Sequence, residues 1–275
     1  MIATAPNSLE IVLDLLETSR RTAASFNDSY AREIRDEQTT DISTRADRAL
    51  SQALVTRASS LLPGAAIWTE ESGKTGSEEP DLIVAIDDLD GTDNFFHGWE
   101  LMPWCTVVAI LRGPQPRFSD VLAAGIIEHR SGILWAASAE GEAFEQAPGG
   151  GWRPLSVSAR EKVDRRTLVF VDHYTARGGT VHLAGIHEQA WVKDFGSSAF
   201  HLACVASGRA EAFVNPVHKA HELAAGYLLV TAAGGCILDF EGHDLGSCPF
   251  DFIGTYPIIA AGTPAIASEL MKLRS

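Results

Sequence analysis

The sequence predicts a layered fold of α-helices and β-strands, built as one large domain or two closely packed halves. Three observations support this prediction: two helical patterns open the chain, a series of strand-like runs follows, and strands and helices alternate afterwards. The 275 residues, 45% of them hydrophobic, suffice for a substantial core. We expect one half over residues 1–150 and the other over residues 151–275, because PGGGW marks a turn or boundary there.

The first two elements are predicted to be helices. Apolar residues at helical spacing from Leu9 onward predict a helix that runs to about Phe26. A second helix is expected from near Thr44 to Leu61, because Thr44 and Asp47 resemble a capping box and a Pro-Gly pair follows the last turn.

Strands are expected next. Residues 65–71 (AAIWTEE) and 81–88 (DLIVAIDD) are each typical of a strand that ends in acidic residues, with a polar loop, GKTGSEEP, between them. Four further runs predict an antiparallel meander: CTVVAIL, VLAAGII, GILWAAS and EAFEQ.

The second half alternates strands and helices. The predicted strands are TLVFVDHY, WVKDFG, EAFVNP and YPIIAAG. The predicted helices are HLAGIHEQA, SSAFHLACVASG, HELAAGYLLVTAAGG and a terminal helix after residue 262. Glycines close two of these helices, at Gly208 and at Gly234-Gly235.

Composition limits the function classes. The net charge of −14 argues against nucleic acid as a partner, and an acidic protein needs local cations, from Lys, Arg or metal, to bind an anionic substrate. No run approaches the roughly 18 apolar residues of a membrane helix, and the N-terminal segment lacks the basic region of a signal peptide. The four cysteines form no CxxC pair, so we expect reduced thiols and a cytoplasmic protein.

Carboxylates lie at the C-terminal ends of two adjacent predicted strands. Glu70 lies at the end of the first, and Asp87 lies at the end of the second, with Asp90 shortly after it. Oxygen ligands without a nearby His or Cys cluster suit a hard cation, above all Mg²⁺. Gly91-Thr92 comes next, where a glycine lets the backbone approach a ligand and its N–H groups can bind an anion if a helix starts there. Metal ligands beside a phosphate cradle suggest metal-assisted phosphoryl chemistry, although spacing alone also allows a solvated acidic turn.

Four motifs follow one another along nearly the whole chain: DISTRAD, WTEES with IDDLDGTDNFFHG, DFGSSAFHLACVASGRAEAFV, and HELAAGYLLVTAAGG. In their sequence and order they resemble the motifs of the inositol monophosphatase family, part of the Mg-dependent, lithium-sensitive phosphatase superfamily. The segment IDDLDGTDNFFHG resembles the family pattern D-P-[IL]-D-G-T-x-N-F-x-H, with one departure.

The resemblance implies a layered αβαβα sandwich like that of inositol monophosphatase and fructose-1,6-bisphosphatase, with the metal-binding carboxylates in the N-terminal half and the C-terminal half completing the site. Glu70, Asp87 and the backbone carbonyl of Leu89 would hold a first Mg²⁺. Asp87, Asp90 and Glu222 would hold a second ion, and Glu70 with water a third, weaker one. Mn²⁺ is an expected substitute.

The resemblance also assigns catalytic and substrate-binding roles. Thr92, hydrogen-bonded to Asp47, would position and activate the attacking water beside Glu70. The N–H groups of Gly91 and Thr92 would hold the phosphate. Three further residues are candidates for substrate contact: Ser197, Ser198 and Asn215. The two serines open a helix, so a capping role for them is an equal alternative.

The chain departs from the family at several of these positions. Asp88 stands where proline is usual, and we expect it to face solvent or to support the ligands without binding metal. The family's W-D reads His221-Glu222, so the third metal carboxylate is a glutamate. Asn215 replaces a substrate-binding glutamate of inositol phosphatases, and the lysine sometimes found before the first motif is absent.

The histidines have structural alternatives. His97 and His201 are expected to be hydrogen-bonded structural residues. HKAHE, residues 218–222, places His, His and Glu at i, i+3 and i+4, which does not match H-E-x-x-H, so zinc is not expected there.

These observations predict a Mg²⁺-dependent phosphatase that hydrolyses a small sugar or polyol (inositol-type) monophosphate by metal-activated water, and a homodimer as the family often is. One alternative is fructose-1,6-bisphosphatase activity, with a second phosphate site from Lys193, Arg209 and Lys219. The other is a degenerate, non-hydrolysing phosphosugar-binding protein. The substrate itself is not predicted, although the HYTARGG loop lies where specificity would be set.

Overall fold

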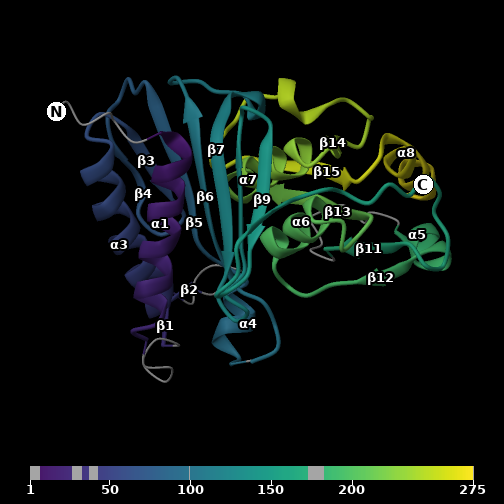
Figure 1. The fold of residues 1–275 in the computed structure, drawn as a ribbon, viewed down its shortest axis with the longest axis horizontal. Helices are drawn as coiled ribbons and strands as arrows, with labels where there is room; N and C mark the ends of the chain where they lie inside the picture. The colour runs from purple at the N-terminus through teal and green to yellow at the C-terminus, as the bar shows by residue number, and fades with distance from the viewer. Residues whose placement is uncertain (1–6, 27–32, 37–42, 99, 173–182, 275) are drawn as a thin grey trace.

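Five layers build the molecule, in the order helices, sheet, helices, sheet, helices (Figure 1). The αβαβα sandwich is therefore confirmed. The computed structural model describes the chain apart from residues 1–6, 27–32, 37–42, 99, 173–182 and 275. The first two residues of DISTRAD and the whole HYTARGG segment lie outside the described residues.

The first layer holds α1 (Ser8–Ala23) and α3 (Arg45–Leu61), which pack on the outer face of the first sheet. Both begin with a capping box, and in α3 its members are Thr44 and Asp47, as predicted. A two-stranded ribbon of β1 (Ile34–Asp36) and β2 (Ser43–Thr44) leads into α3. The cap therefore fixes Asp47 at the buried start of this helix.

The first sheet has eight strands in the order β10-β9-β8-β7-β6-β5-β3-β4, antiparallel except for the β3–β5 pair. The predicted meander forms β6 to β9. The strands are β3 (Ala66–Thr69), β4 (Gly73–Gly76), β5 (Leu82–Asp90), β6 (Cys105–Arg112), β7 (Val121–Glu128), β8 (Leu134–Ser138), β9 (Glu142–Gln146) and β10 (Trp152–Pro154).

The polar segment GKTGSEEP was predicted to be a loop, and this is wrong for its first four residues. They form β4, an edge strand that pairs antiparallel with β3. An edge strand needs only backbone hydrogen bonds to one neighbour, so the apolar alternation that identifies inner strands is missing here.

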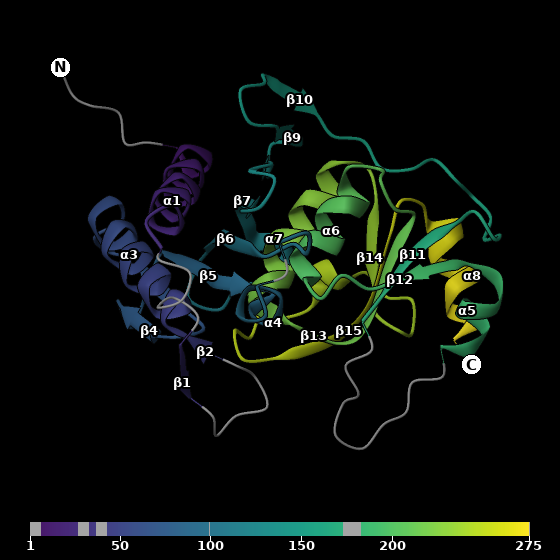
Figure 2. The ribbon, with the colours of Figure 1, turned by 90° about the horizontal axis from the view of Figure 1, so that it is seen from below.

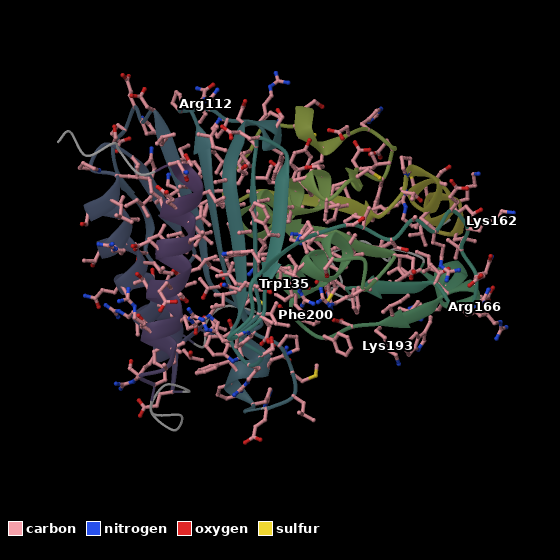
Figure 3. The ribbon with its side chains drawn as sticks, in the orientation of Figure 1. Arg112, Trp135, Lys162, Arg166, Lys193 and Phe200 are labelled. Atoms are coloured by element: carbon pink, nitrogen blue, oxygen red, sulfur yellow. The ribbon has the colours of Figure 1, made fainter. Side chains whose placement is uncertain are left out.

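The central layer consists of α6 (Ser198–Ala206) and α7 (Ala220–Ala232), which lie between the two sheets. Both are largely apolar, because sheets cover them on two sides. A Cβ on Gly226 would lie 2.3 Å from Leu202 Cδ1, so glycine lets the two helices approach closely. Toward the first sheet, the rings of Trp135 and Phe200 meet edge to face with centroids 6.3 Å apart (Figure 3).

The second sheet has five strands in the order β12-β11-β13-β15-β14. They are β11 (Leu168–Val171), β12 (Trp191–Lys193), β13 (Ala212–Lys219), β14 (Cys236–Leu238) and β15 (Thr255–Ala261). The outer layer is α5 (Ala184–Gln189) and α8 (Pro264–Leu273). The described residues also form short helical segments: α4 (Thr92–Phe96) and two 3₁₀ turns, Phe118–Asp120 and Leu245–Ser247.

All four cysteines lie in the described ranges and are free thiols, two buried and two partly exposed. Within the same ranges, the helices lack the length and apolar character that a bilayer crossing would need.

Candidate metal and phosphate site

A β-bulge aims two aspartates of β5 into one site. Asp87 pairs with Val107 of β6 and Asp90 pairs with Cys105, so β5 has one more residue than β6 in this interval. In a regular strand Asp87 and Asp90 would point to opposite faces of the sheet. The extra residue restores a common direction, which is a frequent use of bulges next to functional sites.

Two groups of possible metal ligands result. The first contains Glu70, Asp87 and His221, and the second contains Asp87, Asp90 and Glu222. Within each group the ligand atoms lie within 4.8 Å of one another. Figure 2 shows how the fold achieves this: the carboxyl end of β5 points toward α4 and lies beside α7, whose first turn carries Glu222.

Burial disfavours the ionised state of Asp87, Asp90 and Glu222, and repulsion by other carboxylates adds to this at Asp87 and Glu222. Burial, followed by the nearby carboxylates, raises the pKa of Asp87 and of Glu222 well above the usual range. Burial also raises the pKa of Asp90 to about 6, although hydrogen bonds from the start of α6 partly offset this. A cation among them would relieve the repulsion, so the donor set fits a hard divalent ion.

Lys219 brings a positive charge to the edge of this cluster. Its Nζ lies 2.7 Å from Glu70 Oε1, and both side chains are partly exposed. The ammonium group also lowers the pKa values of Asp87, Asp90 and Glu222, against the larger effect of burial. The sequence suggested Lys219 for a second phosphate site, whereas in the structure it pairs with a candidate metal ligand.

Thr92 joins the end of β5 to the start of α3. Its hydroxyl lies 3.1 Å from Asp47 Oδ1 and 2.9 Å from the carbonyl oxygen of Leu89. Asp47 also accepts hydrogen bonds from the backbone N–H and hydroxyl of Thr44, at 2.8 and 2.5 Å. Burial raises the pKa of Asp47 to about 7 despite these bonds. A carboxyl group with this pKa can exchange a proton near neutral pH.

Gly91 allows the chain to turn from β5 into α4. Its φ of 87° lies in the left-handed region, and a Cβ there would lie 3.0 Å from the carbonyl oxygen of Pro103. Glycine therefore keeps the backbone close to its neighbours at the point where Thr92 begins α4.

Ser197 and Ser198 have different surroundings. Ser197 caps α6 by accepting from the N–H of Phe200 at 3.3 Å, and its hydroxyl donates to Asp90. Ser197 therefore caps the helix and also holds a candidate metal ligand. The Ser198 hydroxyl instead lies 3.3 Å from Asp172 Oδ2, beyond the end of β11.

Asp172 is a residue that sequence reasoning missed. Its Oδ2 also accepts a hydrogen bond from Asn215 Nδ2 at 3.0 Å, and its charge raises the pKa of Glu222. A polar cluster thus lies next to the candidate metal ligand Glu222, and its members are Asp172, Ser198 and Asn215. The available signal was an acid directly after a run of apolar residues, LVFV, as Asp87 comes directly after LIVAI.

Asp88 does not face solvent, and this part of its prediction is wrong. It is 1% exposed, and it accepts a long hydrogen bond, 3.4 Å, from the N–H of Glu71. Burial raises its pKa well above the usual range. Asp88 belongs to neither group of possible metal ligands.

The histidines differ in their roles. His201 accepts a hydrogen bond from the N–H of Phe195 at 3.0 Å, which confirms its structural assignment. His97 packs its ring beside Phe96, with centroids 5.0 Å apart. In HKAHE, His218 turns Nδ1 toward the carbonyl of Lys219 and lies outside both ligand groups. The motif therefore does not converge on one ion, although His221 does join the first group.

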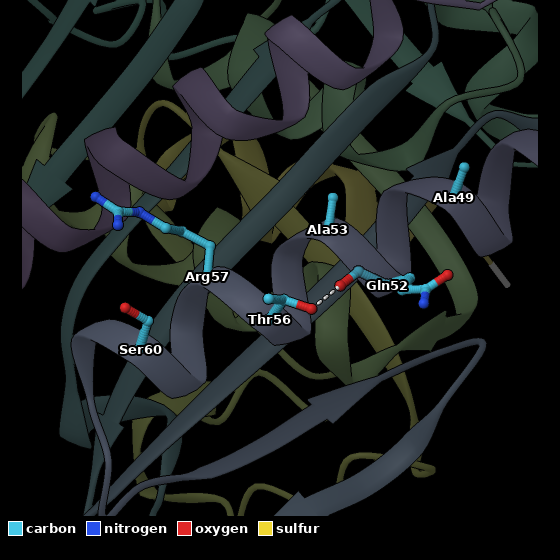
Figure 4. A pocket seen from close by; sticks show the side chains of 6 residues that line it. All are labelled: Ala49, Gln52, Ala53, Thr56, Arg57 and Ser60. Carbon is cyan, nitrogen blue, oxygen red and sulfur yellow. Dashed lines mark hydrogen bonds between the residues drawn. The ribbon is translucent and has the colours of Figure 1, made fainter.

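Two other features do not belong to this site. A hollow of about 530 Å³ lies along one face of α3, lined by Ala49, Gln52, Ala53, Thr56, Arg57 and Ser60 (Figure 4). None of these residues is a candidate metal ligand.

The basic residues expected at a second phosphate site lie apart from one another in their contacts. Arg209 pairs with Glu145 at 2.7 Å, and Lys193 (Figure 3) lies over the Trp191 ring. The three basic residues thus contact three different side chains.

Known proteins resemble the chain over most of its length. An inositol-1-monophosphatase of Mesorhizobium japonicum is 29% identical over 238 residues, 84% of this chain and 82% of that one. The Nus factor SuhB of Pseudomonas aeruginosa is 28% identical and covers 88% of this chain, with 86% of its own length matched. Among solved structures, the extragenic suppressor protein suhB of Bartonella henselae superposes with a TM-score of 0.81 at 23% identity, covering 97% of each chain.

The fold and the site together define the class: an αβαβα protein with carboxylates at the end of β5 that could hold a metal ion. The profile of the inositol monophosphatase family matches residues 6–275. The chain therefore belongs to the inositol monophosphatase family.

Proposed function

We propose that the protein is a divalent-metal-dependent phosphatase that hydrolyses a small sugar or polyol phosphate monoester. One observation carries this proposal: candidate metal carboxylates and the Thr92–Asp47 pair meet at the end of β5. Membership of the inositol monophosphatase family supports it.

The metal would be held by residues of both ligand groups. Glu70, Asp87 and the Leu89 carbonyl would hold one ion, and Asp87, Asp90 and Glu222 a second. When bound, such ions neutralise phosphate charge, lower the pKa of water and stabilise a leaving alkoxide. The Lys219 ammonium on Glu70 already supplies a charge where a third ion was expected, so we propose two ions.

Thr92 and Asp47 would orient the attacking water and accept its proton. The Thr92 hydroxyl donates one proton, and two acceptors, Asp47 and the Leu89 carbonyl, lie within reach. When it donates to Asp47 or Leu89, its lone pairs are available to accept a hydrogen bond from water. With a pKa of about 7, Asp47 would take up the proton and release it to solvent.

The phosphate and the rest of the substrate would contact different residues beside the candidate metal ligands. The N–H groups of Gly91 and Thr92 would hold the phosphate. Asp172, Ser198 and Asn215 would bind hydroxyl groups, because a partly buried carboxylate and a buried amide favour polar ligands of this kind. This cluster favours a polyol or sugar over an aromatic or lipid alcohol.

The two alternative functions differ in how the observations bear on them. Fructose-1,6-bisphosphatase activity would need a second phosphate site, and the separate contacts of Lys193, Arg209 and Lys219 weaken it. A regulatory role without hydrolysis is favoured by the similarity to proteins named Nus factor SuhB. Homodimer formation stays a prediction, which light scattering after gel filtration would test.

The test is a phosphatase screen over inositol, sugar, bisphosphorylated sugar and nucleotide phosphates, with Mg²⁺ and with chelator. We expect release of phosphate from one or more monophosphorylated polyols or sugars, only with metal. A preference for the bisphosphate would select the first alternative. No release from any compound, by protein that binds metal, would select the second.

A further inference from the structure

His221 directs one ring nitrogen at the carboxylates of the metal site. Its Nε2 lies 3.7 Å from Glu70 Oε2, 3.8 Å from Asp87 Oδ2 and 4.0 Å from Glu222 Oε1. Two ligands bound at about 2.1 Å on one octahedral ion lie about 3.0 Å apart when adjacent and about 4.2 Å apart when opposite. The separations of Nε2 from Glu70 and Asp87 lie between these two values, and the ligand atoms of these three residues lie within 4.8 Å of one another. Small shifts of the side chains would therefore bring all three onto one ion.

The other ring nitrogen fixes the protonation pattern. His221 Nδ1 lies 3.3 Å from the carbonyl oxygen of Phe252, which can only accept a hydrogen bond. Nδ1 therefore carries the proton, and in the neutral ring the lone pair of Nε2 points at the carboxylates. Metal-binding histidines usually have this arrangement, with the second nitrogen donating to a carbonyl.

The surroundings hold the ring in place. His221 is 5% exposed, and its ring packs on Phe252 with centroids 4.9 Å apart. Glu70 divides its oxygens: Oε1 binds the ammonium of Lys219, while Oε2 faces His221. One oxygen of Glu70 is thus directed toward the same point as Nε2.

We propose that His221 is a direct ligand of the ion held by Glu70 and Asp87, and that this site therefore prefers Mn²⁺ to Mg²⁺. Imidazole suits first-row transition ions, whereas Mg²⁺ takes oxygen ligands almost exclusively. Mn²⁺ accepts both, so it fits two carboxylates with one imidazole. The inference rests on the metal-binding part of the proposed function and changes which ion serves it.

The test is metal binding by titration calorimetry, with pulsed EPR of the Mn²⁺ complex. We expect wild-type protein to bind Mn²⁺ more tightly than Mg²⁺ and to show the hyperfine coupling of a directly bound ¹⁴N. His221→Gln should abolish the coupling and weaken Mn²⁺ binding by about 10- to 100-fold, with Mg²⁺ binding changed far less. His221→Trp, which restores the family residue, should behave in the same way.

His243→Gln is the matched control. His243 also pairs with a carboxylate, Asp239 at 3.1 Å, but on the exposed surface. This variant should keep both the coupling and the affinities. Wild-type protein without ¹⁴N coupling, or a His221→Gln protein with an unchanged Mn²⁺-to-Mg²⁺ ratio, would overturn the proposal. Neither result depends on turnover: hydrolysis with no bound nitrogen refutes this inference alone, and bound nitrogen without hydrolysis refutes the phosphatase proposal alone.

Discussion

The hydroxyl of Thr92 lies 3.1 Å from the carboxylate of Asp47, a residue 45 positions earlier in the chain. Asp47 is also part of the capping box of α3, so the same side chain starts a helix and supports a candidate catalytic group. The position of Thr92 is therefore set by two elements, β5 and α3.

Replacing Thr92 tests the role of this pair. Thr92→Ala should lower kcat by about 10²- to 10⁴-fold, the range for a positioned proton-transfer group, and leave metal affinity nearly unchanged. Thr92→Ser keeps the hydroxyl and should retain most of the activity. Steady-state kinetics and calorimetric metal titration measure the two effects, and an equal loss of metal affinity would make Thr92 a ligand.

Substitutions of Glu222 test whether the second group of possible metal ligands binds an ion. Its carboxylate is buried beside those of Asp87 and Asp90, although a glutamate in the first turn of α7 also has the position of a simple cap. Glu222→Gln should lower kcat sharply and raise the metal concentration needed for half-maximal activity, whereas Glu222→Asp should keep substantial activity. Wild-type behaviour of Glu222→Gln at limiting metal would leave only the capping role.

Metal removal tests the mechanism as a whole. Because buried carboxylates with raised pKa values need a cation to be ionised together, activity should vanish in excess chelator. Added Mg²⁺ or Mn²⁺ should restore it. Phosphate release at full rate in chelator would rule out metal-dependent hydrolysis.

Asn215 tests substrate preference. It replaces a glutamate that binds inositol hydroxyls in the family, and here its amide donates to Asp172. We expect wild-type kcat/KM for inositol phosphates to exceed that for sugar phosphates by less than about 10²-fold, or 2.7 kcal/mol. Asn215→Glu should shift the ratio toward inositol phosphates. A wild-type preference above that limit would show that Asn215 is no obstacle to inositol.

Replacing His129, a buried histidine outside the candidate site, tests how the free energy of unfolding depends on pH. Burial lowers its pKa from 6.5 to about 3, and its Nε2 lies 3.0 Å from the Thr106 hydroxyl. Between these pH values the unfolded chain binds a proton that the folded protein does not, so the free energy of unfolding falls as pH falls through this window. The contribution to the slope is about 1.4 kcal/mol per pH unit.

His129→Phe keeps the stacking on Trp104 and removes the titrating group. Its unfolding free energy, measured with denaturant between about pH 4 and 6, should vary with pH less steeply than wild type by that amount. Thr106→Val removes the same hydrogen bond but keeps the histidine, so its slope should match wild type. Equal slopes for His129→Phe and wild type would mean that His129 is already charged in the folded protein.

Apolar patterns in the sequence predicted most of the helices and strands. The register between strands and the identity of the edge strands could be established only from the structure. The meander follows from alternating and apolar runs, because inner strands must bury their side chains. β4 was missed because an edge strand can be polar. β14 was missed because three residues, Cys236–Leu238, are too few to show a period.

The candidate site was predicted at its centre and missed at its margins. Glu70, Asp87, Asp90 and Glu222 were found by motif, and the structure brings their carboxylates together in two groups. The β5 bulge that aims Asp87 and Asp90 the same way depends on pairing with β6, which no spacing within β5 reveals. Asp172 and His221 joined the site only through contacts between distant segments.

Asp90 connects β5 of the first sheet to the start of α6 and is also a candidate metal ligand. Its carboxylate accepts the Ser197 hydroxyl and the N–H groups of Ser198 and Ala199, the latter two at 3.2 and 3.0 Å. An ion bound to the Asp90 carboxylate would therefore compete for its oxygens with the hydrogen-bond donors at the start of α6. Ion binding would therefore be coupled to the hydrogen bonds at the start of α6. Amide hydrogen exchange at Ser198 and Ala199 should then change with the fraction of protein that has bound the ion.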